Sequence, residues 1–300
     1  FIELSQMLFR PLRQIADKFN TLQMGMVAAN RVFDILDTEA NIEDNGTLEI
    51  GNLKGEIEFK DVRFSYVDDE EVLKGITFKV NPGETVAIVG ATGAGKSTII
   101  NLLSRFYEID SGCILVDDTN IKDIQLRSLR AQIAVVLQNV FLFADTIMNN
   151  INLDNPDISD EDVINAAKQI GIHEFITSLP GGYYYNVKER GAMLSSGQRQ
   201  LISFLRAYVS NPSILVLDEA TSSVDSYSEQ LIQDATDKIT EDRTSIVIAH
   251  RLATIKKADK IIVMDQGEIV EIGNHKQLLQ RTDGYYRKLY EVQFKEEEAI

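Results

Sequence analysis

The sequence has little cysteine and no long apolar run. Its 300 residues include one cysteine, Cys113, which excludes a disulfide within the chain and a metal site built from several cysteines. Such usage is typical of a reducing compartment. No uninterrupted run of about 18 apolar residues occurs, and no secretory signal pattern is visible. We therefore expect no complete transmembrane helix, and a chain that is soluble by itself.

Positive charge is also scarce. The chain carries 30 Lys and Arg residues against 46 Asp and Glu residues, which gives a formal net charge of −16. This balance argues against the basic face that a nucleic-acid partner requires. It does not exclude a local anion site built from backbone amides and one lysine. The hydrophobic fraction of 44% is ordinary for a globular protein with a core.

Residues 1–36 are predicted to form a helix, because their apolar residues recur in alternating steps of four and three along one seam. Pro11 is expected to break or kink this helix near its start. From the pattern alone, a helix that packs on its own domain is favoured over one that meets a partner absent from this sequence. The seam consists of Leu8, Leu12, Ile15, Phe19, Leu22, Met26, Ala29, Phe33 and Leu36.

The rest of the chain is predicted to alternate strands and helices. Residues 37–54 are acidic, show no helical stripe and are interpreted as a linker. Ile57 and Phe59 follow the period-two pattern of a strand. A helix is expected at 98–107, and residues 139–210 are predicted to be mostly helical. Apolar runs in "TVAIVG", "SILVLDE", "TSIVIAH" and "KIIVMD" predict an α/β fold with a largely parallel sheet.

A glycine-rich stretch lies between a predicted strand and a predicted helix. "GATGAGKS" fits the phosphate-loop pattern, in which glycines let backbone amides approach a polyphosphate at a helix N-terminus. Lys96 is predicted to reach the β- and γ-phosphates, and Ser97 to bind Mg²⁺. The full pattern in this context favours a phosphate site over a ligand-free glycine turn. The predicted nucleotide-binding residues are Gly90, Ala91, Thr92, Gly93, Ala94, Gly95, Lys96, Ser97 and Thr98.

Two further stretches carry candidate chemistry. "ILVLDE" ends an apolar strand in Asp218, which suits Mg²⁺, and Glu219, which is placed to act as a general base. With a phosphate loop upstream, these roles are favoured over simple capping of the next helix. Ser195 and Gln198 fit a capping box, whose exposed amides could form a second anion cradle. The residues alone favour an ordinary capped helix there.

Taken together, the phosphate loop, "LSSGQRQ", "ILVLDE" and a late histidine in "IAHR" resemble the ATP-binding cassette (ABC) family over about residues 55–295. The resemblance implies a P-loop NTPase (RecA-like) core, an antiparallel β subdomain, and an inserted helical subdomain at about 139–210. Residues 296–300 remain as a tail. The implied cofactors are ATP and Mg²⁺.

The resemblance also implies roles for single residues. Tyr66 would stack on adenine, Gln138 would touch Mg²⁺ and sense the membrane part, and His250 would contact the γ-phosphate. Asp225 matches the loop that crosses between two subunits. Two cassettes of this family pair head to tail, so the signature residues would complete a partner's ATP site. These are Ser195, Ser196, Gly197 and Gln198.

The subtype resembles exporters. "ERG" at 189–191 is similar to the exporter X-loop, and residues 1–36 are similar to the cytoplasmic end of the last transmembrane helix. This reverses the preference stated above for residues 1–36, whose seam would face the transmembrane domain. The sequence begins at Phe1 rather than Met, as expected of a fragment or a processed chain. We therefore expect the ATPase domain of an exporter at the cytoplasmic face of the cell membrane.

Some alternatives stay open at this point. Ser196 stands where the signature usually has glycine, which puts the partner site's hydrolysis rate in doubt, and Ser223 replaces a common alanine. Both a homodimer and a heterodimer fit. Two other functions are a soluble cassette ATPase acting on nucleic acid or ribosomes, and a regulatory cassette that binds ATP without turnover. The transported substrate cannot be read from these residues.

Overall fold

The structure is a computed structural model that describes residues 2–38, 42–218, 226–249 and 251–293. The chain divides into two compact units, residues 1–43 and residues 44–300. The division falls after Glu43, inside the segment 37–54 that we interpreted as a linker.

The first unit consists of one long helix, α1 (Ile2–Leu36). It runs through Pro11 without interruption, so the break that we considered at this proline does not occur. The large seam side chains from Leu12 to Leu36 are 57–71% exposed. The helix thus presents an apolar seam and has no core of its own. No helix among the described residues is long and apolar enough to cross a bilayer.

The second unit is organised around a six-stranded sheet in the order β10-β9-β3-β8-β7-β6. The pairs from β9 to β6 are parallel and only β10 is antiparallel, which confirms the predicted α/β architecture. The short "DQG" turn joins β9 to β10 as a hairpin. The strands are β3 (Thr85–Gly90), β6 (Ile133–Val136), β7 (Ile214–Asp218), β8 (Thr244–Ile248), β9 (Lys260–Asp265) and β10 (Glu268–Gly273).

Strand periodicity divides the core into two layers, because successive side chains point to opposite faces of a sheet. In β3, Val86 and Ile88 belong to one apolar cluster, and Ala87 and Val89 belong to the other. The first cluster lies against a second, four-stranded antiparallel sheet in the order β2-β1-β4-β5. Its strands are β1 (Ile57–Ser65), β2 (Glu71–Val80), β4 (Ser111–Val116) and β5 (Thr119–Asn120).

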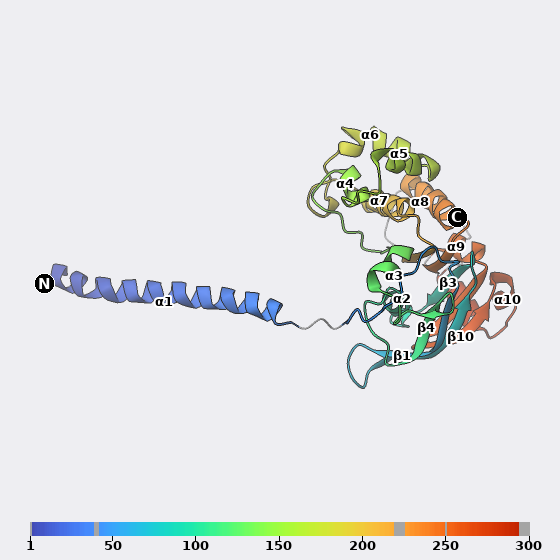
Figure 1. Cartoon of the computed structure of the whole chain (residues 1–300), viewed down its shortest axis with the longest axis horizontal. Helices are drawn as coiled ribbons and strands as arrows, with labels where there is room; N and C mark the ends of the chain where they lie inside the picture. The colour runs from blue at the N-terminus through green and yellow to red at the C-terminus, as the bar shows by residue number, and fades with distance from the viewer. Residues whose placement is uncertain (1, 39–41, 219–225, 250, 294–300) are drawn as a thin grey trace. The chain divides into compact units, whose positions relative to one another are not determined.

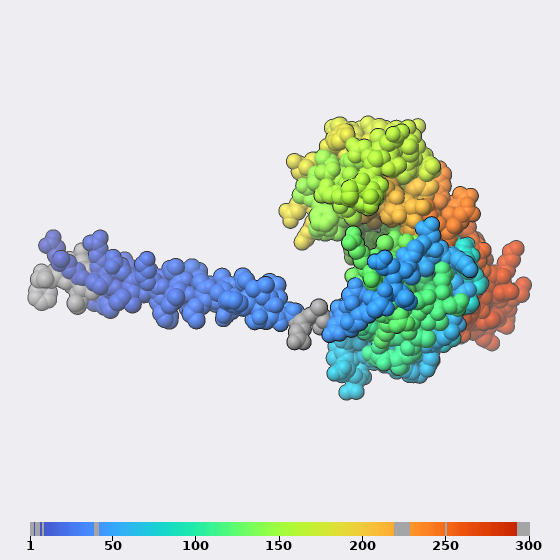
Figure 2. Space-filling view, in the orientation of Figure 1, coloured from blue at the N-terminus to red at the C-terminus, as the bar shows by residue number. Residues whose placement is uncertain are grey.

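The other cluster extends into the helices between β6 and β7, which gather in a lobe above the sheets (Figure 1). Figure 2 shows a hollow on the visible face between this helical lobe and the lobe that carries the sheets. The lobe contains α4 (Ile147–Asn152), α5 (Asp160–Gln169), α6 (His173–Ser178), α7 (Ser196–Val209) and the short 3₁₀ turns η1 (Gly182–Tyr184) and η2 (Glu189–Gly191).

The remaining helices connect or flank the strands. The predicted helix 98–107 is shorter and starts earlier, because α2 begins at Lys96 and ends where Arg105 takes the left-handed φ of 52°. The helices are α2 (Lys96–Leu103), α3 (Leu126–Gln132), α8 (Ser226–Thr240), α9 (Leu252–Lys257), α10 (His275–Leu279) and α11 (Tyr285–Gln293).

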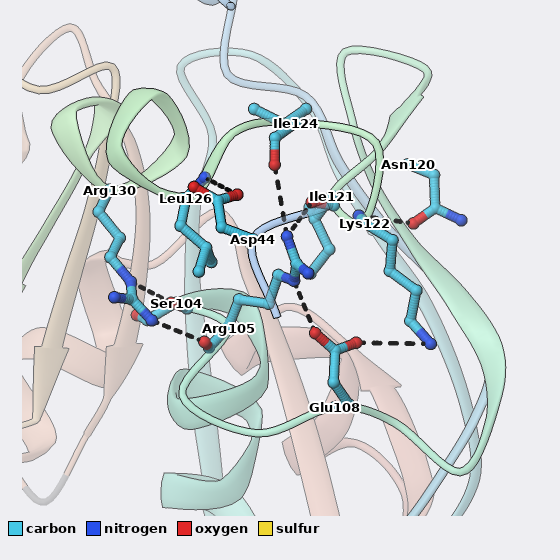
Figure 3. A network of polar contacts seen from close by, with 10 residues as sticks. All are labelled: Asp44, Ser104, Arg105, Glu108, Asn120, Ile121, Lys122, Ile124, Leu126 and Arg130. Carbon is cyan, nitrogen blue, oxygen red and sulfur yellow. Dashed lines mark hydrogen bonds and ion pairs between the residues drawn. The ribbon is translucent and has the colours of Figure 1, made fainter. Parts of the chain in front are cut away.

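The segment before β1 lies on the sheet-bearing lobe rather than apart from it. Asp44 accepts a hydrogen bond from the Leu126 amide at 2.9 Å (Figure 3), and the hydroxyl of Ser128 bonds both the amide and the carbonyl of Ile50. Gly46 closely approaches the residues just before α3, since a Cβ there would lie 2.2 Å from the Ile124 carbonyl oxygen. Hydrogen bonds to residues 123–128 therefore hold residues 44–50 beside the start of α3.

Candidate functional site

The glycine loop leaves β3 and leads directly into α2. Gly90 is required by a close approach, because a Cβ there would lie 2.2 Å from the carbonyl oxygen of Met264 on β9. Gly93 has a φ of 83°, and no atom lies within 4 Å of the position of an added Cβ. The loop backbone at Gly93 therefore borders open space. The first N–H groups of α2 have no partners within the helix, so this end of α2 can receive an anion.

Lys96 is folded back onto this loop. Its Nζ donates hydrogen bonds to the carbonyl oxygens of Gly90 at 2.8 Å and Ala91 at 2.9 Å. The residue is only 8% exposed. Burial lowers the pKa of the ammonium, and the nearby Asp218 carboxylate partly opposes this effect. The loop thus holds a largely desolvated cation through two carbonyl contacts that an anion could replace.

Asp218 is the last residue of β7, at the carboxyl end of the parallel sheet, where α/β folds bind ligands. Burial raises the pKa of its carboxyl group, and the Lys96 charge lowers it in part. A carboxylate that pays a desolvation cost beside a single lysine would gain from a second cation. This environment makes Asp218 a candidate metal ligand.

An open cavity of about 500 Å³ brings the predicted residues together. This volume lies in the range of small-molecule sites, about 300–1,000 Å³. Two lining residues were missed by the sequence reasoning, Val72 at the start of β2 and Ile248 at the end of β8. Ile248 could have been found from strand register, since it pairs with Asp218. The predicted residues that line the cavity are Tyr66, Thr92, Gly93, Gly95, Lys96, Ser97, Thr98, Gln138 and Asp218.

Three predicted loop residues do not line this cavity. Gly90 and Ala91 contribute the carbonyls that hold Lys96, whereas Ala94 is buried in the core. Three further predicted residues, Glu219, Asp225 and His250, lie outside the described part of the chain.

The signature residues occupy a different place. Ser195 caps α7, accepting a bond from the Gln198 amide, and the Gln198 side chain accepts one from the Ser195 amide. This confirms the predicted capping box. Ser195, Ser196, Gly197 and Gln198 are not among the residues that line the cavity. The amides at the start of α7 therefore lie outside the residues that line this cavity.

The turn before the signature has an unusual backbone. Lys188 has a φ of 61° with a ψ of −178°, a region that is nearly restricted to glycine, and Arg190 is left-handed with a φ of 54°. Glu189 and Arg190 are exposed, while Gly191 is buried against Leu142 and the Arg199 side chain. The turn therefore presents the charged side chains of Lys188, Glu189 and Arg190 at the surface beside α7.

Comparison with known proteins gives consistent results. Residues 73–222, half of the chain, match the ABC transporter family. An ATP-dependent lipid A-core flippase of Idiomarina loihiensis is 50% identical over 96% of this chain and 50% of that protein. A probable multidrug resistance ABC transporter ATP-binding/permease protein, YheH, of Bacillus subtilis is 44% identical over 100% of this chain and 44% of that protein.

A solved structure is also similar. It is a bacterial Atm1-family ABC exporter with ATP bound, with a TM-score of 0.80 and 41% identity over 95% of this chain and 50% of that chain. This likeness confirms the fold expected from the sequence motifs. The chain spans about half the length of these relatives.

Proposed function

Because the chain belongs to the ABC transporter family, we propose that it is the ATP-hydrolysing domain of an exporter. The observation that carries this proposal is the single cavity that joins Tyr66, the glycine loop, Lys96 and Asp218. Tyr66 suits a base, the glycine loop and Lys96 suit a polyphosphate, and Asp218 suits a divalent cation. The relatives named as a flippase and a multidrug transporter support export as the process that hydrolysis drives.

ATP binding would use the loop amides and Lys96. The ammonium would leave the carbonyls of Gly90 and Ala91 for the β- and γ-phosphates, at little structural cost because the loop already holds it at the cavity. Thr98 and the other loop residues would surround the phosphates, and the exposed ring of Tyr66 would stack on the base.

We propose that this cavity holds Mg²⁺ together with the nucleotide. Among the described residues, no group of three His, Cys, Asp or Glu side chains could hold a metal. Mg²⁺ commonly takes one or two protein ligands and completes its shell with phosphate oxygens and water. Ser97, Gln138 and Asp218 are the proposed protein contacts. The cation would supply charge neutralisation of the phosphates.

Hydrolysis is proposed to need a second cassette. The α7 amides of the signature lie outside the chain's own cavity, which supports their use by the nucleotide of a partner in a head-to-tail dimer. In this proposal Glu219 acts as general base on water, His250 contacts the γ-phosphate, and Asp225 lies at the dimer interface. The partner is a second copy or a related chain.

The exposed seam of α1 in the first unit supports a contact with a membrane-embedded domain. This apolar seam needs a covering surface, and we propose helices of the exporter's transmembrane domain. The cassette would then work at the cytoplasmic face of the membrane.

Light scattering of the Glu219→Gln variant tests the shared site. The variant should bind Mg-ATP and form a stable dimer, because binding is kept while hydrolysis is lost. The matched control is the Lys96→Ala/Glu219→Gln double variant, which should stay monomeric in ATP. A Glu219→Gln variant that is always monomeric and turns over ATP at the normal rate would contradict the proposal. A salt-sensitive shift of DNA or RNA by the chain would instead favour a nucleic-acid ATPase.

A further inference from the structure

We propose that Tyr107 and Asn101 are positioning residues that hold the ring of Tyr66 ready to receive the adenine base. This inference rests on the proposed function, because it concerns the same ATP site. Neither residue lines the cavity. Their action on nucleotide would pass entirely through Tyr66.

The ring of Tyr66 is held by aromatic neighbours. Tyr107 meets it with centroids 5.0 Å apart at an interplanar angle of 88°, and Phe64 meets it at 4.7 Å and 86°. Tyr107 also contacts Phe64, at 5.7 Å. Such edge-to-face pairs are a favoured aromatic arrangement. Tyr66 nevertheless remains 45% exposed and lines the cavity, so a surface is left for a base.

The hydroxyl of Tyr66 is held by the phosphate-loop helix. It donates to Thr98 Oγ1 at 3.3 Å and accepts from Asn101 Nδ2 at 3.1 Å. Thr98 and Asn101 are three residues apart on α2 and therefore share one face of that helix. The same helix begins at Lys96. The proposed base platform and the phosphate site are thus tied to one rigid element.

The end of α2 explains how Tyr107 reaches the ring. The Phe106 amide donates to the Asn101 carbonyl at 2.8 Å, and the Arg105 amide to the Leu102 carbonyl at 3.0 Å. Together these bonds form a Schellman turn, in which the left-handed position is usually glycine. Here Arg105 occupies it with a φ of 52°. The turn reverses the chain and carries Tyr107 back beside Tyr66.

The side chain of Arg105 holds this turn in place (Figure 3). It is buried, with Nε 2.8 Å from Glu108 Oε1 and Nη1 donating to the carbonyls of Ile121 and Ile124 at 3.3 Å. Lys122 approaches the other oxygen of Glu108 at 3.5 Å. A non-glycine residue persists in a left-handed conformation when its surroundings over-determine it. The contacts of Arg105 supply that constraint.

Phe106 offers a matched control. It is 46% exposed, nearly the same as Tyr107 at 45%, but its ring faces the Arg130 guanidinium at 5.1 Å. Truncating either ring removes a similar aromatic surface from the same turn. Of these two rings, Tyr107 is the one that meets Tyr66, whereas Phe106 faces Arg130.

The experiment compares two probes, Mg-ATP and Mg-triphosphate without a base, each displacing a fluorescent ATP analogue from the purified chain. Tyr107→Ala should weaken the affinity for ATP by about three- to tenfold, which corresponds to the energy of one aromatic pair. Its affinity for triphosphate should not change. Asn101→Ala should act in the same direction. Tyr107→Phe should retain full ATP affinity, because its ring contact needs no hydroxyl, and Phe106→Ala should match the unaltered chain.

The outcomes separate the two proposals. If Tyr66→Ala weakens ATP but Tyr107→Ala does not, the positioning role is wrong and the ATP site stands. Equal losses of ATP and triphosphate in Tyr107→Ala would also overturn it, because they would indicate damage to the phosphate loop. If the unaltered chain binds no ATP, the proposed function itself fails. The Tyr66→Ala/Tyr107→Ala double variant should be no weaker than Tyr66→Ala.

Discussion

Replacing Lys96 with alanine should weaken ATP binding while leaving the fold intact. The ammonium makes two hydrogen bonds in the described structure, to the carbonyls of Gly90 and Ala91. In the proposed complex it exchanges them for bonds to phosphate. Hydrogen bonds that involve a charged group contribute about 1.5–3 kcal/mol each. The two phosphate bonds contribute about 3–6 kcal/mol, from which the carbonyl bonds given up in exchange, worth up to about 2 kcal/mol, are subtracted. The variant should therefore bind ATP at least about fivefold more weakly.

The variant should keep most of its stability. The two carbonyls border an open cavity, so water can replace the ammonium as their partner. The variant also loses a buried charge whose pKa burial has lowered. We therefore expect the free energy of unfolding to fall by no more than about 2 kcal/mol, and the variant to remain folded at 25 °C.

The assay is a fluorescent-nucleotide titration together with a thermal melt. Lys79→Ala is the matched control, because it removes the same charge from an exposed lysine that pairs with Glu56 at 2.7 Å, outside the cavity. It should bind ATP normally. An unchanged affinity in Lys96→Ala would refute the phosphate-loop assignment. An equal loss in Lys79→Ala would show that net charge, rather than the site, sets the affinity.

Two further predictions follow from the site. Ser195→Ala should lower the melting temperature by about 2–4 °C, since losing an N-cap costs about 1 kcal/mol. The ATP affinity of the isolated chain should not change, because Ser195 does not line the cavity. Ser195→Thr should restore the melting temperature. Asp218→Asn should remove most of the Mg²⁺-dependent gain in ATP affinity without lowering the nucleotide-free melting temperature, because burial disfavours the charged carboxylate; a variant that keeps the full Mg²⁺ effect in calorimetry would exclude Asp218 as a ligand.

Much of the fold is predictable because buried parallel strands are nearly continuous apolar runs. β3, β7 and β8 are of this kind, and each is fully predicted from its sequence. The glycine loop is equally predictable from sequence, since its spacing reflects a backbone requirement at Gly90 and Gly93. The capping box at Ser195 is also predictable, because it joins two residues only three positions apart in the sequence.

Features that depend on tertiary contact were not predictable. Residues 44–54 have no apolar period, yet isolated residues such as Ile50 and Leu53 pack on the core while backbone groups bond to α3 and Asp117. α2 ends early because the contacts of Arg105 stabilise a left-handed residue. The pairing of Tyr107 with Tyr66 joins residues 41 positions apart, and no local pattern indicates it.

The central claim is that two cassettes share each ATP site, and the most direct test is the Mg-ATPase rate measured against protein concentration. For the unaltered chain, the account predicts a rate that rises faster than linearly with concentration. It also predicts that Glu219→Gln loses this activity while still binding ATP. A rate strictly proportional to concentration, down to levels at which the chain is monomeric, would contradict a site completed by a second cassette.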